Sequence, residues 1–64
     1  MYRADFVRAV AALLDVALSE ANELSHIVWY ALDLNENDEV RGPHLYQACR
    51  LARRAYDYRH EQAA

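Results

Sequence analysis

The chain has 64 residues, of which 55% are hydrophobic and 27% charged, and its formal net charge is −3. A chain of this length forms one domain, 1–64, and its apolar content is too high for a disordered protein. The negative charge argues against a general nucleic-acid binder, which gains its affinity by neutralising phosphates, and no uncharged run approaches the roughly 20 apolar residues of a membrane span.

The cysteine usage bears on the compartment of the protein, and the arginine usage bears on its source. The single cysteine cannot form an internal disulfide, and no group of Cys and His has zinc-finger spacing. All seven basic residues are arginine, which suits a GC-rich bacterial or phage genome. We therefore expect a cytoplasmic protein without a metal, a cofactor or a secretory signal.

Residues 3–34 predict one long helix, because apolar residues recur at alternating spacings of three and four, the pattern by which one helix packs along another. This seam comprises Val7, Val10, Leu14, Ala17, Ala21, Leu24, Val28 and Ala31. At 1.5 Å per residue the helix would be about 48 Å long. Polar residues occupy its opposite face, and Tyr30 falls among them.

Residues 35–42 predict a connector, since Asn35, Asn37 and Gly42 favour turns. Pro43 suits the first position of a second helix, which would run over residues 43–61 for about 28 Å. Its apolar stripe comprises Leu45, Ala48, Cys49, Ala52, Ala55 and Tyr56. The predicted fold is all-α, an antiparallel helical hairpin.

The unequal lengths of the two helices predict a dimer. Folded back, the second helix reaches only to about residue 16 of the first, so a monomer would leave the N-terminal half of the first helix exposed. The exposed residues would be Phe6, Val7, Val10, Leu13 and Leu14. Burying each Phe, Val or Leu is worth roughly 1.5–3 kcal/mol. We expect these residues to form the interface of a homodimeric four-helix bundle, or to bind a different protein.

The segment that begins at Asp33 resembles an EF-hand calcium loop, with Asp33, Asn35 and Asn37 at loop positions one, three and five. Two departures argue against calcium binding. Asp38 stands where the loop needs glycine, and His44 replaces the bidentate glutamate. The expected structure is a polar turn.

One face of the second helix carries Arg50, Arg53 and Arg54. This strip could contact nucleic-acid phosphates. Alternatively, antiparallel folding would set Arg53 and Arg54 opposite Glu20 and Glu23 in surface ion pairs. We favour the ion pairs, and regard Tyr30 as the best exposed aromatic for binding a partner.

The sequence contains no set of nucleophile, base and acid and no glycine-rich phosphate loop, so we expect no enzymatic activity. The leading hypothesis is a small bacterial or phage protein–protein interaction module that binds itself and an unidentified protein. The alternative is an RNA- or DNA-binding dimer that uses the arginine strip. It would be similar in hairpin and dimer geometry, though in no sequence motif, to the plasmid RNA-binding protein ROP.

Overall fold

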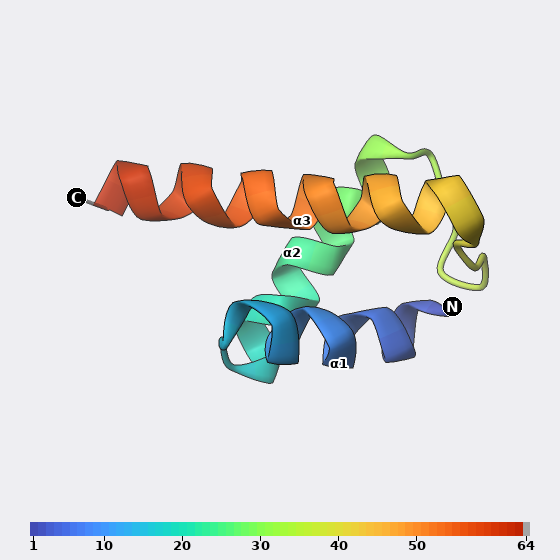
Figure 1. Ribbon diagram of the computed structural model, residues 1–64, viewed down its shortest axis with the longest axis horizontal. Coiled ribbons are helices and arrows are strands. Elements are labelled where there is room, and N and C mark those ends of the chain that lie inside the picture. The colour runs from blue at the N-terminus through green and yellow to red at the C-terminus, as the bar shows by residue number, and fades with distance from the viewer. Residues whose placement is uncertain (64) are drawn as a thin grey trace.

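The computed structural model describes residues 1–63, which form three helices: α1 (Arg3–Leu14), α2 (Leu18–Ala31) and α3 (Gly42–Ala63). In the view of Figure 1, α1 and α3 run in the same direction and α2 crosses between them. Both α1 and α3 pack mainly on α2. The all-α prediction is confirmed. The two-helix hairpin is wrong, because the predicted first helix is broken into α1 and α2.

The break occupies Asp15, Val16 and Ala17. Asp15 adopts the left-handed conformation, with φ 55° and ψ 52°, and the Val16 N–H donates to the Ala11 carbonyl oxygen at 3.0 Å. Aspartate enters the left-handed region more readily than most non-glycine residues. Ala17 is extended, and its carbonyl accepts the Ala21 N–H at 3.0 Å as α2 begins. These three residues therefore reverse the chain without glycine or proline.

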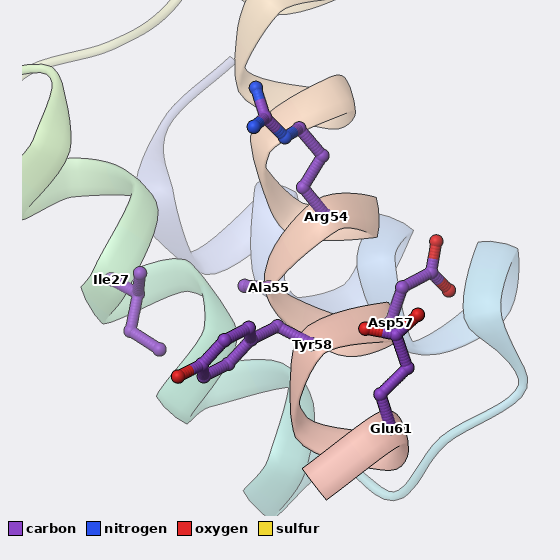
Figure 2. A pocket seen from close by; sticks show the side chains of 6 residues that line it. All are labelled: Ile27, Arg54, Ala55, Asp57, Tyr58 and Glu61. Atoms are coloured by element: carbon purple, nitrogen blue, oxygen red, sulfur yellow. The ribbon is translucent and has the colours of Figure 1, made fainter.

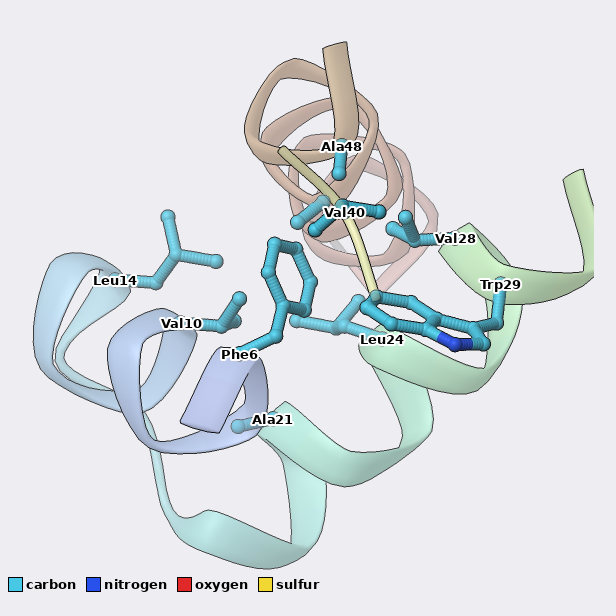
Figure 3. Packing of buried hydrophobic residues seen from close by; sticks show 10 residues of the cluster. Phe6, Val10, Leu14, Ala21, Leu24, Val28, Trp29, Val40 and Ala48 are labelled. Atoms are coloured by element: carbon cyan, nitrogen blue, oxygen red, sulfur yellow. The ribbon is translucent and has the colours of Figure 1, made fainter. Parts of the chain in front are cut away.

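Burial of α1 explains why the chain breaks here. Phe6, Val10 and Leu14 pack against α2 and are at most 8% exposed, although a continuous helix would leave them unpaired. Figure 3 shows Phe6 and Val10 pointing towards Leu24 of α2. A left-handed residue costs about 1–2 kcal/mol, whereas burying each large apolar side chain gains roughly 1.5–3 kcal/mol. The gain from three such side chains exceeds the cost of the turn.

The aromatic centre of this core is the pair Phe6 and Trp29. Their ring centroids lie 5.1 Å apart with a 50° angle between the ring planes, a tilted arrangement that aromatic rings favour. Phe6 is 0% and Trp29 2% exposed. The Trp29 indole N–H has no hydrogen-bond acceptor among residues 1–63. Through this pair the start of α1 packs against the end of α2.

The second predicted helix is confirmed as α3, with ends within about two residues of the prediction. Gly42, its first residue, has φ +51°, a conformation that disfavours any side chain. Ala48 and Ala52 are buried against the other elements, and Cys49 is half-buried. The small side chains allow α3 to approach α2 closely.

The connector between α2 and α3 is held by the first residues of the chain. The Val40 N–H donates to the Met1 carbonyl oxygen at 2.9 Å, and Tyr2 and Glu39 form an isolated antiparallel bridge. Val40 is 2% exposed and completes the core. In the resulting arrangement the connector packs on the start of α1, as Figure 1 shows at the N-terminus.

In the part of the chain that the structure describes, each helix is too short or too polar to cross a lipid bilayer.

Candidate functional site

The predicted dimer surface on the first helix is not available as a surface. Phe6, Val10 and Leu14 lie inside the core, and Val7 is half-buried. Leu13 alone of the five is well exposed, at 66%. The premise that a monomer leaves these residues uncovered is wrong, because α1 folds back onto α2. An interface built on all five would require α1 to detach from the core.

Tyr30 is 83% exposed, as the polar position of this residue indicated. It borders a shallow depression of about 260 Å³ that also involves Arg3, His26 and Trp29. The Trp29 indole nitrogen is enclosed by protein and so cannot be reached from this depression without a shift in the surrounding side chains. Leu34, Asn35 and Glu36 complete its lining, so the depression combines apolar and aromatic surface with charged groups.

The acidic residues of α2 pair with the last turns of α3. Glu23 lies 3.6 Å from the Arg59 guanidinium, and Glu20 lies 3.2 Å from His60 Nε2. The predicted pairing of these acids with the middle of the second helix is wrong. The helix α2 crosses α3 at an angle and does not run alongside it as in a hairpin, so its acidic residues meet a different part of α3 (Figure 1).

The three arginines of the predicted strip have different surroundings. Arg53 pairs within its own helix with Asp57, at 3.2 Å. Arg50 lies over the Tyr46 ring, 5.9 Å from its centroid. Among the side chains that the structure describes, Arg50 and Arg54 take part in no ion pair. Two of the three arginines are thus available to an external anion or carboxylate.

An open groove of about 550 Å³ lies between α2 and α3. We call it the α2–α3 groove. It is lined by Ile27, Arg54, Ala55, Asp57, Tyr58 and Glu61. Figure 2 shows the Tyr58 ring reaching towards Ile27, while Asp57 and Glu61 project from the other side of α3. Ile27 is 42% and Tyr58 64% exposed, so the groove has an uncovered apolar wall beside a charged rim.

The α2–α3 groove continues along α3. Gln47, Arg50, Leu51 and Arg54 line a smaller hollow of about 160 Å³, and Arg54 belongs to both concavities. One surface therefore follows α3 from Gln47 to Glu61.

The sequence did not predict this groove, because Ile27 and Tyr58 lie on the flanks of the two apolar stripes and not in the stripes themselves. The signal in the sequence was the presence of these two large apolar side chains outside the stripes that form the core. The positions do not reveal that both flanks face the same side of the molecule, because that depends on how α2 crosses α3.

Beneath the connector lies a small cavity of about 110 Å³, bordered by Glu39 and His44. The Glu39 carboxylate accepts a hydrogen bond from the Arg41 guanidinium and lies 3.4 Å from the Met1 amino group. The hydrogen bond from Arg41 lowers the pKa of the Glu39 carboxyl below its usual range, partial burial opposes this, and the positive charge of Arg41 reinforces it. The cavity is too small for most organic ligands.

The EF-hand-like segment forms a closed polar turn. The Asn35 N–H donates to Asp38 Oδ2 at 2.8 Å, and the Asp38 N–H donates to the Asn35 carbonyl oxygen at 3.0 Å. Asp38 is thereby committed to the local backbone. Over residues 1–63 no three His, Cys, Asp or Glu side chains converge as metal ligands would.

Comparison with known protein families, with curated proteins and with solved structures finds no match to this chain.

Proposed function

We propose that this protein is a small, non-enzymatic interaction module that binds a partner protein through the α2–α3 groove. The observation that carries the proposal is the exposed apolar wall of Ile27 and Tyr58 beside the charged residues Arg54, Asp57 and Glu61. Protein interfaces combine an apolar centre, often aromatic, with a polar rim. An open groove along a helix suits a helical partner, whose side chains would fill it.

Self-association belongs to the same proposal, but not through the surface expected from the sequence. Phe6, Val10 and Leu14 are already covered within one chain, so they provide no drive to pair. Two copies of a three-helix protein would also not form the four-helix bundle expected of two hairpins. A dimer would instead use the exposed side chains of α3.

The test is capture of partners on the immobilised protein from an extract of the cells that encode it. A Tyr58→Asp variant should lose the partner, because it places a charge on the apolar wall. The matched control is Tyr46→Asp, which changes an equally exposed tyrosine of α3 (68% against 64%) outside the groove. Retention of the same partner by Tyr58→Asp, or its equal loss in both variants, would contradict the proposal.

A second candidate function, binding to nucleic acid, rests on Arg50 and Arg54. Neither has an ionic partner among the described side chains, and both line the hollow next to the groove. Arg53 contributes less, since Asp57 neutralises it. The likeness to ROP no longer supports this candidate, because the chain is not a two-helix hairpin.

We also propose a cytoplasmic location, in a bacterium or a phage-infected cell. Its support is the half-buried Cys49, which has no second cysteine to pair with and suits a reducing compartment. Finding the protein in a periplasmic or secreted fraction would contradict this location.

A further inference from the structure

Four charged side chains form one stripe along the exposed side of α3. Arg50, Arg54, Asp57 and Glu61 follow one another at spacings of four, three and four, which places them on the same face of a helix. All four are exposed, and Asp57 also lies 3.2 Å from Arg53 of its own helix, so it would share its carboxylate between Arg53 and a partner. The order of charge along the stripe is two positive residues and then two negative residues. A stripe of this order is complementary to its own reversed copy.

We propose that the occupant of the α2–α3 groove is a second copy of this chain, with the two α3 helices packed antiparallel about a two-fold axis. In this arrangement Arg50 faces the partner's Glu61, and Arg54 faces the partner's Asp57. The midpoint of each pair along the helix lies between Ala55 and Tyr56. A two-fold axis at that one position therefore forms both pairs. The inference rests on the proposed function, because it names the partner of the same groove.

The apolar side chains beside the stripe fit the same axis. Leu51, Ala55 and Tyr58 lie at spacings of four and three on the neighbouring stripe. Ala55 and Tyr58 line the groove with Ile27 of α2, and Leu51 lines the adjoining hollow. Each Tyr58 ring would enter the groove of the other copy and cover its Ile27.

Symmetry also selects the direction of packing. In a two-fold dimer each surface meets its own copy, so every contact occurs twice. Antiparallel helices bring the charged stripe of one copy against the charged stripe of the other, with opposite signs facing. Parallel helices in the same register would place arginine against arginine and carboxylate against carboxylate, which is unfavourable. Exposed ion pairs add little affinity individually, but they do fix orientation and partner choice.

The experiment measures mass in solution by sedimentation equilibrium over micromolar to millimolar concentrations. The wild type should shift from the 7.4 kDa monomer to twice that mass as concentration rises. Added salt should weaken the dimer, because it screens the exposed pairs. A wild type that stays monomeric throughout would overturn the proposal.

Charge reversal locates the interface. The variant Arg50→Glu with Arg54→Glu carries four negative charges on the stripe, and the variant Asp57→Arg with Glu61→Arg carries four positive charges. Each variant alone should be monomeric. An equimolar mixture should form a heterodimer, and the quadruple variant that exchanges all four charges should form a homodimer again. Dimers that survive both reversals, or a mixture that stays monomeric, would overturn the proposal.

Circular dichroism of each variant confirms that it is folded. If a reversal prevents folding, the milder pair Arg50→Gln with Arg54→Gln should weaken the dimer while leaving the helices intact. An unchanged dimer in that folded variant would also overturn the proposal. The Leu13→Ser variant, whose change lies on the exposed side of α1, is the matched control and should dimerise as the wild type does.

Failure of this inference and failure of the proposed function give different results. A monomeric wild type that still captures a protein dependent on Tyr58 disproves the homodimer and leaves the interaction function standing. A monomer that captures nothing dependent on Tyr58 disproves both.

Discussion

Asp15 is the residue that ends α1, because its left-handed backbone conformation separates α1 from α2. Glycine tolerates this conformation and alanine does not. We expect Asp15→Gly to be more stable than Asp15→Ala by about 1 kcal/mol, measured by urea unfolding. Both variants lack the carboxylate, so their difference reports the backbone alone.

A continuous helix predicts the opposite order, since alanine stabilises a helix interior by about 1 kcal/mol over glycine. Ser19, an exposed residue in the first turn of α2, is the internal control. Ser19→Ala should be more stable than Ser19→Gly. If alanine were also more stabilising than glycine at position 15, the helix would not be broken at Asp15.

Glu39 should make stability depend on pH in the acidic range. Its pKa is lower in the folded protein than usual, chiefly because Arg41 donates a hydrogen bond to the carboxylate. The carboxylate therefore stabilises the fold above the ordinary glutamate pKa, about 4.3, and loses this contribution as the pH falls through the folded-state value. When the pH is lowered from neutral to below the ordinary glutamate pKa, the melting temperature of Glu39→Gln should fall less than that of the wild type.

The size of this effect should be modest, because Arg41 is 79% exposed and Glu39 is only partly buried, so solvent screens the pair. Glu36→Gln removes one exposed carboxylate from the same connector and serves as the control. An acid transition in Glu39→Gln that matches those of the wild type and of Glu36→Gln would show that the Glu39 contact contributes nothing.

At the scale of elements, the packing of α1 on α2 should account for most of the stability. Phe6→Ala removes a fully buried ring that contacts Trp29, and such a change costs about 3–5 kcal/mol. A domain of this size has a total stability of only a few kcal/mol, so we expect the variant to be largely unfolded at room temperature by circular dichroism.

Leu13 also lies in α1, next to the buried Leu14, but its own side chain is exposed. Leu13→Ala should therefore change the free energy of unfolding by about 0.5 kcal/mol or less. The expectation from the sequence was different, since it gave Phe6 and Leu13 the same role in a dimer. Equal losses from both variants, with a matching loss of dimer, would favour that earlier expectation.

The two halves of the chain differ in how far their structure could be predicted. The second helix was predictable because Pro43 and Gly42 mark its start and its small apolar stripe is regular. The break at residues 15–17 was not, because neither glycine nor proline marks it and the apolar spacing continues through it unchanged. The decisive factor is tertiary: Phe6, Val10 and Leu14 gain more by folding back than the helix loses.

The candidate site shows the same limit. Exposure of Tyr30 and of the arginines followed from their positions on polar faces. The α2–α3 groove did not, because it exists only where α2 crosses α3. For the same reason Glu20 and Glu23 contact His60 and Arg59, and not Arg53 and Arg54 as predicted.

For the whole molecule, the uneven distribution of charge is the strongest constraint on partners. Residues 15–39 contain seven acidic residues and no lysine or arginine, whereas α3 carries four arginines and two acids. Nucleic acid approaching α3 would also meet the acidic surface of α2 and the connector. We therefore expect no binding to RNA or DNA tighter than about 10⁻⁴–10⁻⁶ M at physiological salt.

Fluorescence anisotropy with labelled duplex and loop RNA tests this expectation. Nanomolar binding that weakens steeply with salt, and that Arg50→Glu with Arg54→Glu abolishes, would contradict it. Replacing Arg3 and Arg8 of α1 by glutamate lowers the net charge by the same four units and is the control.

The unbroken apolar spacing through residues 15–17 has a further consequence for how the protein behaves in concentrated samples. If this turn opens, α1 and α2 can join into one straight helix, and the α1 segments of two molecules can exchange places. Every core contact would be kept, and only the turn would change, so the exchange of segments has a low cost. Such a domain-swapped dimer would not respond to the charges of α3, which separates it from the dimer proposed above. Asp15→Gly, which favours the turn, should reduce the exchange in concentrated samples.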